Sequence, residues 1–300
     1  MSNPHVVIIV LNTNRRDDTL ECLGSIQRSD YVDLSVVVLD NASTDGSVEA
    51  IQLQFPWVEI LPLSDNRGYA GNNNVGIELA VSRGAEWVFV LNEDTVLAPD
   101  CISKLIATGD SHPQIGMIGP LVYHYDEPEV IQSAGVVLGR YLHSTHLGQN
   151  EMDTGQFTGW QEVEAITGCS LCVRSDVIRE IGALDERFFY YWEETDWCLR
   201  ARQAGWLNAV EPAAKLWHKG VQRDYRPKPS VAYYNTRNRL LTLSKQRVPP
   251  DVWVTVYGEM LRTLVIMSVR PKWRNHLQHR DALWRGLVDF HQHNWGRGRV

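Results

Sequence analysis

The stretch Val6-Val-Ile-Ile-Val-Leu-Asn-Thr-Asn14 decides the fold. Six apolar residues in a row, followed by three polar ones, are typical of a strand buried on both faces of a parallel sheet. Three further runs have the same character, namely Ser35–Asp40, Val58–Leu63 and Trp87–Asn92. The first hundred residues therefore predict four buried parallel strands.

Helical segments separate these strands. We expect helices over Asp18–Ser29, Gly46–Gln54 and Tyr69–Ser82, and the spacing of Asp18 and Glu21 predicts a capping box at the start of the first. Such alternation implies right-handed βαβ units in a doubly wound sheet. Ligands of such sheets bind outside the carboxyl ends of the strands, which is where we look for chemistry.

The rest of the chain loses this alternation. Residues 120–165 read as short strands and loops, and residues after Ser230 as mostly helical. Between them we expect a strand at Glu164–Arg174, a helix at Ser175–Ile181, an acidic helix ending at Gly205, and short strands at Asn208–Val210 and Lys215–His218.

Composition excludes several classes of protein. The 300 residues suffice for one large α/β domain or a domain with an appendage, and the net charge of −7 argues against nucleic acid as a partner. Cys169 and Cys172 form a lone C-x-x-C without a second pair, so buried thiols in a reducing compartment are favoured over zinc or redox chemistry. Val6–Leu11 is too short for a signal peptide, and no uninterrupted apolar run reaches membrane-spanning length, so we expect a cytoplasmic protein.

Polar residues follow the predicted strands where the site is expected. Asp40 ends the second strand and is suited to accept hydrogen bonds from a nucleobase or ribose; a turn-stabilising role is the alternative. Asp94 follows the buried run that begins at Trp87. Burial of a carboxylate at such a position costs desolvation free energy unless a cation is present. Mg²⁺ or Mn²⁺ bridging to a diphosphate fits these oxygen ligands, and a helix cap is the alternative.

A second acidic cluster lies within Leu184–Arg202, where an aromatic loop turns into a helix. Glu193, Glu194 and Asp196 occupy the first turn, at the positive end of the helix dipole. An ionised carboxylate beside an aromatic wall is able to take a proton from an alcohol. The alternative is helix-terminal charge together with an Asp196–Arg200 pair one turn apart.

Eight segments together resemble one enzyme family, the family 2 glycosyltransferases with the GT-A fold, and within it the bacterial rhamnosyltransferase-like branch. The segments are Val6–Asn14, Leu39–Ser47, Asn66–Gly76, Leu91–Thr95, Gly168–Arg174, Leu184–Arg202, Trp217-His218 and Tyr233–Arg239. Their order covers most of residues 5–240, and no single segment would suffice.

The resemblance implies an architecture. It is a Rossmann-like, mostly parallel central sheet flanked by helices, with a helical C-terminal extension. Residues 1–240 would form the GT-A domain, with a nucleotide-binding half at about 1–110 and an acceptor-binding half at 111–240. Residues 241–300 would form the extension.

The resemblance also implies residue roles on the donor side. The donor nucleotide would be bound by Asn12, Thr13, Asn14, Asp40, Asn41, Arg67, Gly68, Gly71, Asn92 and Glu93. Asp94 matches the last acid of the family's metal-binding D-x-D element, whose first position is Asn92 here. His218 would supply a second ligand to Mg²⁺ or Mn²⁺.

On the acceptor side, Glu194 falls where the family usually has a catalytic aspartate. One extra methylene shifts the carboxylate, so Glu193 and Asp196 stay as alternatives to Glu194 as the base. Trp192 and Gly168 are assigned to the acceptor, with packing as the alternative for Trp192. Arg237 and Asn238 are candidates to reach the diphosphate, and a solvated helix face is their alternative.

The implied activity is inverting, metal-dependent transfer of rhamnose or a hexose from a dTDP- or UDP-sugar. The acceptor would be a hydroxyl of a saccharide or a lipid-linked molecule in cell-surface polysaccharide synthesis. Two alternatives stay open: a silent nucleotide-sugar binding subunit, and a sugar-1-phosphate nucleotidyltransferase. The second would want a glycine-rich loop after the first strand, and Asn12-Thr-Asn-Arg-Arg16 has no glycine.

The apolar segment Val252–Val269 carries Glu259 and Arg262, so we expect it not to span a bilayer. It would cover the sheet, form a homodimer contact, or lie on the inner face of a membrane as a peripheral element.

Overall fold

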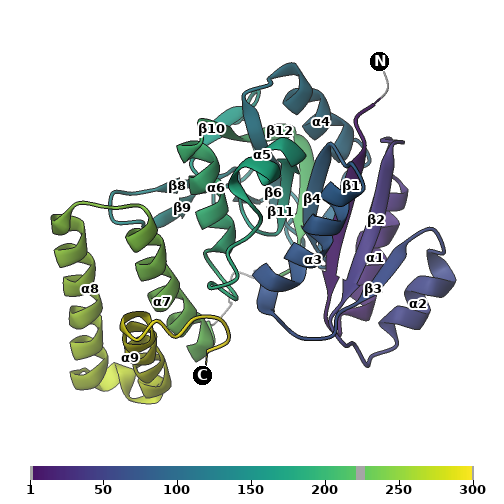
Figure 1. The fold of residues 1–300 in the computed structure, drawn as a ribbon. Helices are drawn as coiled ribbons and strands as arrows, with labels where there is room; N and C mark the ends of the chain where they lie inside the picture. Colours follow the sequence, from purple (N-terminus) through teal and green to yellow (C-terminus); the bar gives the residue numbers. More distant parts are fainter. Residues whose placement is uncertain (1–2, 221–226, 299–300) are drawn as a thin grey trace.

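The computed structural model describes residues 3–220 and 227–298. Within these residues a ten-stranded sheet lies between two layers of helices, and a separate group of helices follows at the C-terminal end (Figure 1). The main path of the sheet has the order β10-β12-β6-β11-β4-β1-β2-β3. This confirms the predicted α/β fold with a mostly parallel central sheet.

The first four strands are parallel neighbours, as the apolar runs predict. They are β1 (Val6–Asn12), β2 (Leu34–Asp40), β3 (Glu59–Pro62) and β4 (Trp87–Asn92). Asn12 lies opposite Asp40, and Leu11 lies opposite Asn92. The polar ends of the strands therefore meet at one edge of the sheet.

The second half of the sheet is mixed. It contains β5 (Thr95–Leu97), β6 (Ile115–His124), β7 (Ile131–Ser133), β10 (Gln161–Val163), β11 (Ser170–Arg174) and β12 (Leu207–His218), while β8 (Val136–Leu138) and β9 (Ser144–His146) form a separate hairpin. Two expectations are wrong here. Residues 164–169 are not part of a strand, and the two short strands expected near Val210 and His218 are one strand, with a register shift between Glu211 and Lys215.

Helices cover both faces because alternate residues of each strand point to opposite sides. On one face pack α1 (Arg16–Gln27), α2 (Ser47–Gln54) and α4 (Cys101–Ser111); on the other pack α3 (Gly68–Ser82), α5 (Ser175–Ile181) and α6 (Glu193–Gln203). In β1, Ile8 enters the first core and Ile9 the second. This explains why the run from Val6 is apolar at every position.

The predicted capping box is wrong. Helix α1 begins at Arg16, its N-cap is Arg15, and no side chain caps it. Asp18 and Glu21 instead hold the ammonium group of Lys219, with Asp18 2.9 Å away. The two acids therefore tie α1 to the end of β12.

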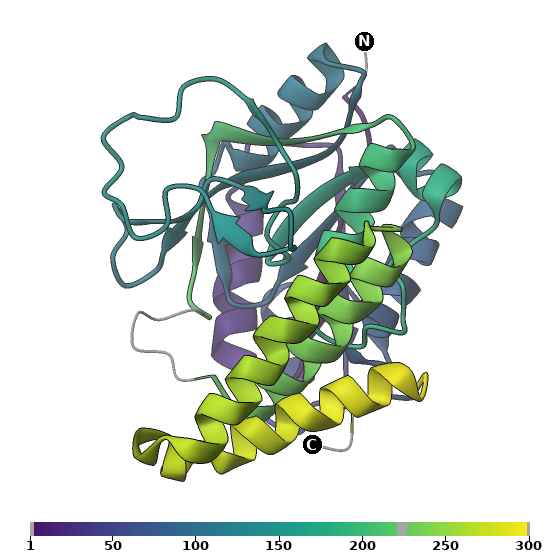
Figure 2. The same ribbon diagram turned by 90° about the vertical axis from the view of Figure 1, so that its left-hand side faces the viewer.

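Three helices and a short 3₁₀ turn form the C-terminal unit. They are α7 (Pro229–Lys245), α8 (Pro250–Val269), η1 (Pro271–His276) and α9 (Leu277–His291), seen together in Figure 2. Leu240, Leu243, Val256 and Leu287 belong to the small core of this unit. Helix α7 spans residue 240, so the helical unit begins at Pro229 rather than at the expected residue 241.

The expectation that helix α8 does not span a bilayer stays a prediction. By length and composition alone it is apolar enough to cross a membrane, and only 22% of its most apolar window is buried. Among the described residues no other helix meets this criterion.

All five cysteines are buried and none forms a disulfide. This agrees with the interpretation of Cys169 and Cys172 as buried thiols.

Candidate active site

Asp40 is fixed at the carboxyl end of β2 by the strand beside it. The buried Asn12 amide donates to Asp40 Oδ1 at 2.8 Å, and the Ser43 backbone N–H donates to Asp40 Oδ2 at 3.1 Å. The same Asn12 nitrogen also reaches the Ser43 and Ser47 hydroxyls. Asn12 is therefore placed to orient Asp40 and its loop.

The neighbouring loop residues are held in a similar way. Asn14 has φ 52° and accepts a hydrogen bond from the Thr44 backbone N–H at 2.8 Å. Asn41 donates to the exposed Thr13 hydroxyl at 3.3 Å. Asn14 therefore shapes the loop, and Thr13 is exposed at this edge.

Asp94 and His218 face each other at the end of the sheet. Asp94 Oδ1 lies 3.2 Å from His218 Nε2, and this buried oxygen makes no well-directed hydrogen bond. His218 Nδ1 lies 2.8 Å from Gln132 Oε1. Since an amide oxygen only accepts, Nδ1 carries a proton and Nε2 is turned toward Asp94, as in histidines that bind metals through Nε2.

Charge governs the protonation of this pair. Burial opposes the charged form of His218, but the neighbouring Cys169 and Asp94 outweigh it and raise the pKa of His218 to about 10. Burial by itself would raise the pKa of Asp94, but His218 and Arg15 lower it. Without a cation, therefore, a proton on His218 balances the Asp94 carboxylate.

Gly220 leaves a gap beside these two side chains. A Cβ at Gly220 would lie 2.6 Å from Asp94 Oδ2 and 2.9 Å from His218 Nε2. No group of three or more His, Cys, Asp and Glu side chains that could hold a metal occurs in residues 3–220 and 227–298. The two ligands, the unsatisfied oxygen and the gap fit a divalent cation that takes its other ligands from phosphate and water.

Arg15 and Glu93 complete this end of the site. Arg15 lies 3.5 Å from Asp94 and 3.7 Å from Glu93. Burial and the adjacent Asp94 raise the pKa of Glu93 to about 7. Asn92 contributes its backbone N–H to Cys169 O at 2.9 Å. Sequence reasoning did not single out Arg15 or Gln132; the position of Arg15 after the first strand was a usable signal, whereas Gln132 had none.

The loop of residues 185–192, which we call the aromatic loop, has an unusual backbone. Phe189, Tyr191 and Trp192 have φ angles of 64°, 67° and 77°. Non-glycine residues adopt such angles at a cost of about 1 kcal/mol or more, so surrounding contacts must hold them.

Two buried side chains of α7 supply these contacts. Asn238 Nδ2 donates to the carbonyl oxygens of Phe188, Tyr190 and Tyr191 at 3.0, 2.9 and 2.8 Å. Arg237 donates to Phe188 O at 2.9 Å. The interpretation of Arg237 and Asn238 as diphosphate ligands or a solvated face is wrong, because both are fully buried and fasten the aromatic loop.

The start of α3 holds the loop from the other side. Gly68 has φ 76°, and a Cβ there would lie 2.3 Å from Phe189 O. A Cβ at Gly71 would lie 2.5 Å from Arg67 Cβ, and the exposed Arg67 guanidinium pairs with Glu186. The requirement for these two glycines thus comes from packing within the chain.

Glu193 and Glu194 follow the aromatic loop at the start of α6. Burial and the charge of Glu194 raise the pKa of Glu193 well above 4.5, and Glu193 Oε2 has no hydrogen-bond partner. Burial also raises the pKa of Glu194, but the Thr195 hydroxyl 3.2 Å away and backbone N–H groups stabilise its charge. Of the two side chains, Glu194 therefore has the contacts that stabilise a carboxylate.

Residues 168 and 169 connect the acid pair to the metal-binding pair. Tyr69 donates its hydroxyl hydrogen to Gly168 O at 2.6 Å, and a Cβ at Gly168 would lie 3.3 Å from Glu194 Cγ. Cys169 is one of the groups that raise the pKa of His218. The structure thus brings Glu194, Gly168 and His218 to one end of the sheet.

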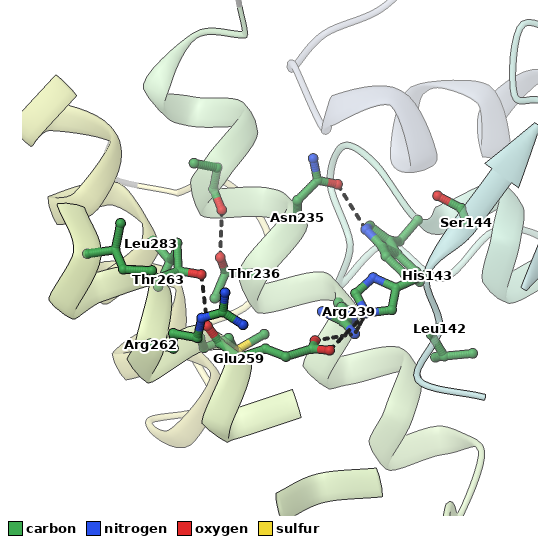
Figure 3. A pocket seen from close by; sticks show the side chains of 14 residues that line it. Leu142, His143, Ser144, Asn235, Thr236, Arg239, Glu259, Arg262, Thr263 and Leu283 are labelled. Atoms are coloured by element: carbon green, nitrogen blue, oxygen red, sulfur yellow. Dashed lines mark hydrogen bonds and ion pairs between the residues drawn. The ribbon is translucent and has the colours of Figure 1, made fainter. Parts of the chain in front are cut away.

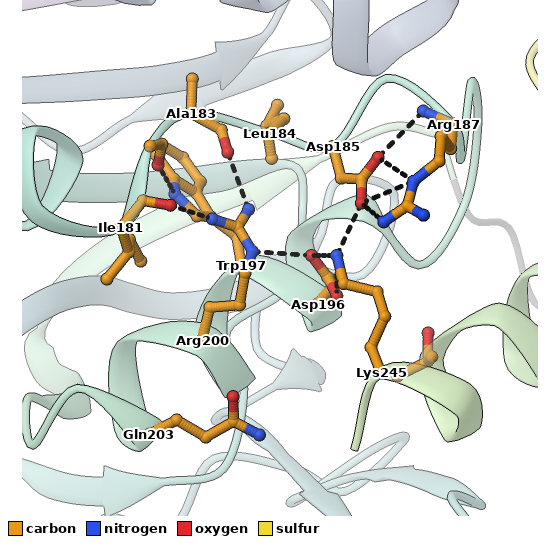
Figure 4. Close-up of polar contacts among 12 residues, drawn as sticks. Ile181, Ala183, Leu184, Asp185, Arg187, Asp196, Trp197, Arg200, Gln203 and Lys245 are labelled. Carbon is orange, nitrogen blue, oxygen red and sulfur yellow. Dashed lines mark hydrogen bonds and ion pairs between the residues drawn. The ribbon is translucent and has the colours of Figure 1, made fainter. Parts of the chain in front are cut away.

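Asp196 has a different environment, shown in Figure 4. Its fully buried carboxylate pairs with Arg200 at 2.8 Å, as the sequence predicts, and with Lys245 of α7 at 2.7 Å. Lys245 also binds Asp185 at 2.6 Å, so these ion pairs join α6, α7 and the aromatic loop. Two cations on Asp196 leave it poorly suited to act as a base.

A cavity of about 670 Å³ lies between the β8–β9 hairpin, α7 and α8 (Figure 3). Its wall contains Trp192, whose indole N–H donates to Asn235 Oδ1 at 2.9 Å. Arg239 in the same wall binds Glu259 at 3.1 Å. Glu193 and Glu194 are not among the lining residues, and Trp192, which directly precedes Glu193, is the lining residue nearest to them in sequence.

Comparisons with known proteins identify the family and the fold of the chain. Residues 6–182 match the model of the family described as "Glycosyl transferase family 2". The chain is 30% identical over 219 residues to the N-acetylglucosaminyl-diphospho-decaprenol L-rhamnosyltransferase of Mycobacterium tuberculosis, covering 65% of this chain and 70% of the relative. It is 23% identical to the dTDP-rhamnosyl transferase RfbF of Shigella flexneri, covering 90% of each.

Among solved structures, the mannosyltransferase PcManGT from Pyrobaculum calidifontis in complex with GDP-Man and Mn²⁺ has a TM-score of 0.61 at 16% identity, covering 98% of this chain and 89% of that one. At this identity the likeness shows the fold alone, which is GT-A. The fold, the family match and the rhamnosyltransferase relatives lead to one conclusion: the chain belongs to glycosyl transferase family 2, as a rhamnosyltransferase-like glycosyltransferase.

Proposed function

We propose that the protein transfers a sugar, with inversion at the anomeric carbon, from a nucleotide-sugar to a hydroxyl group of a saccharide acceptor. The observation that carries the proposal is that residues 168–169 contact both groups: Gly168 packs against Glu194, and Cys169 accepts a hydrogen bond from Asn92, two residues before Asp94 of the Asp94–His218 pair. The names of both rhamnosyltransferase relatives support rhamnose as the sugar, and that of the Shigella flexneri relative supports dTDP-rhamnose as the donor. A UDP-hexose is the competing donor.

The donor nucleotide would lie across the carboxyl ends of β1, β2 and β4. Asp40, fixed by Asn12, accepts hydrogen bonds from the base or ribose beside Thr13 and Asn41. Asp94 and His218 would hold Mg²⁺ or Mn²⁺, whose role when bound is to neutralise the departing diphosphate. Arg15, which lies 3.5 Å from Asp94, adds a fixed positive charge at the same end.

Glu194 would be the general base. It takes the proton of the acceptor hydroxyl as that oxygen attacks the anomeric carbon, a contribution of roughly 10²- to 10⁴-fold in rate. Glu194 suits this role better than Glu193, because the Thr195 hydroxyl lies 3.2 Å from Glu194 whereas Glu193 Oε2 has no hydrogen-bond partner. The absence of a side chain at Gly168 lets Glu194 pack closely against this part of the backbone.

The acceptor would occupy the cavity beside Trp192. Its wall offers the indole ring for stacking on a sugar, and Asn235 and Arg239 for hydrogen bonding. The name of the M. tuberculosis relative supports a saccharide carried on a lipid diphosphate, in cell-surface polysaccharide synthesis. Residues 1–110 would thus bind the nucleotide and residues 111–240 most of the acceptor, at the cytoplasmic face of a membrane.

The experiment is a donor panel. Binding of dTDP, UDP and GDP is measured by calorimetry with Mg²⁺, Mn²⁺ or EDTA, and the cognate nucleotide-sugar is then tested for turnover, with the anomeric configuration of the product read by NMR. We expect metal-dependent binding of dTDP and an inverted product. Metal-independent binding, or a product of retained configuration, would contradict the proposal.

A further inference from the structure

Helix α8 presents an apolar stripe to solvent. Val254, Leu261, Val265 and Val269 are between 52% and 74% exposed. They are spaced 7, 4 and 4 residues apart, so they lie along one side of the helix. The buried residues Val252, Val256, Met260 and Met267 occupy the opposite side. The stripe is therefore a second apolar face, which no part of the described chain covers.

The charge at the C-terminal end of this stripe is the reverse of that of the whole protein, although Asp251 and Glu259 lie nearer its beginning. The segment from residue 262 to residue 285 contains six Lys and Arg residues and one Asp, in a chain with a net charge of −7. Arg262 and Arg270, at the edge and the end of α8, are both exposed. A local excess of positive charge beside exposed apolar side chains is the composition of a helix that lies on an anionic bilayer.

We propose that α8 docks on the surface of an anionic phospholipid membrane. Val254, Leu261 and Val265 enter the boundary between headgroups and acyl chains, and the exposed Arg262 and Arg270 bind the phosphates of the headgroups. The helix lies along the surface rather than spanning the bilayer, because its other face is packed into the C-terminal helical unit. A second copy of the chain fits the stripe less well, since two basic segments would be brought together.

Docking would serve the proposed acceptor cavity, and this step alone rests on the proposed function. Five α8 residues, Glu259, Met260, Arg262, Thr263 and Ile266, line that cavity. One side of α8 thus faces the membrane while the adjacent side faces the cavity. A saccharide linked to a lipid diphosphate would then reach the cavity while its lipid chain stays in the bilayer.

Vesicle flotation tests the docking without any transfer assay. Vesicles of phosphatidylcholine alone are compared with vesicles containing phosphatidylglycerol, for the wild type and for the double variant Leu261→Asp/Val265→Asp. The matched control is Val32→Asp/Leu53→Asp, whose two residues are 82% and 83% exposed on another part of the molecule. Thermal unfolding checks that each variant is folded.

We expect the wild type and the control to float with phosphatidylglycerol vesicles, less so at high salt, and the α8 variant to bind at least ~10-fold more weakly. Equal binding by the α8 variant would overturn the proposal, as would equal binding to both kinds of vesicle. A wild-type dimer in solution that only the α8 variant dissociates would assign the stripe to a second copy instead. Hydrolysis of the donor in the absence of acceptor is measured alongside and should be unchanged in the α8 variant. A failure of the proposed chemistry can then be distinguished from a failure of membrane docking.

Discussion

Replacement of Asn238 by alanine should slow sugar transfer without weakening nucleotide binding. The Asn238 amide has two hydrogens, and they are directed at three backbone carbonyls of the aromatic loop at 2.8–3.0 Å. These contacts hold Tyr191 and Trp192 at positive φ, immediately before Glu193 and Glu194. Without them we expect the loop to relax and the acid pair to lose its position.

The magnitude follows from the lost hydrogen bonds. Two buried hydrogen bonds contribute about 1 kcal/mol each, so their removal destabilises the observed conformation of the aromatic loop by about 2 kcal/mol. If the activation free energy of transfer rises by this whole amount, kcat falls by about 30-fold. Phe188 O keeps its bond from Arg237 at 2.9 Å, which limits the disturbance to the end of the loop nearest the acids.

The assay separates positioning from general damage. We would measure kcat for transfer, the Kd of the nucleotide with Mg²⁺, and the Tm. Ser244→Ala is the matched control, because it removes a hydrogen bond made only within the same helix. The reasoning is refuted if Asn238→Ala keeps kcat within twofold of wild type, or if the nucleotide Kd rises by the same factor as kcat falls.

Three further predictions concern the metal-binding pair and the buried charges. Gly220→Ala would place a methyl group 2.6 Å from Asp94 Oδ2, so calorimetry should show nucleotide binding that no longer responds to Mg²⁺ or Mn²⁺; a preserved metal dependence contradicts the assignment. Glu193 has a raised pKa, so the stability it provides is present below about pH 4.5 and lost as the pH rises through that raised value. Glu193→Gln should therefore match the wild-type Tm at pH 4 and exceed it at pH 8, and parallel Tm curves would show that the group does not titrate as described. Lys245→Met removes the cation shared by Asp185 and Asp196, which should lower the free energy of unfolding in urea by about 3 kcal/mol; a loss below about 1 kcal/mol would mean that Arg187 and Arg200 suffice.

The parallel half of the fold was predictable because its signal is local. Continuous apolar runs such as Val6–Leu11 identify strands buried on both faces, and the polar residues behind them identify the edge where ligands bind. The helix after Arg174 and the stop at Gly205 follow from equally local signals. Residues 164–169 failed as a strand because their position is set by contacts with distant segments, such as Tyr69 on Gly168.

The same limit applies to side chains whose partners are far away in sequence. Asp18 has the spacing of a capping residue but binds Lys219, which lies 201 positions further along. Arg237 and Asn238 look like surface polar groups, yet they are buried against carbonyls of the aromatic loop. Periodicity carries no information on such pairs, since tertiary packing overrides the local preference of each residue. For Glu194, by contrast, a local motif suffices to propose the base, which stays a prediction, and the structure adds that Thr195 contacts Glu194 while Glu193 Oε2 has no partner.

The account depends most on Glu194 as the base that faces a metal-bound nucleotide. The direct measurement is the transfer rate of Glu194→Gln at saturating donor and acceptor, together with its nucleotide Kd in the presence of Mg²⁺. We predict a loss in kcat of roughly 10²- to 10⁴-fold with the Kd within about twofold of wild type. A variant that transfers sugar at the wild-type rate would contradict the account and move the base to another residue.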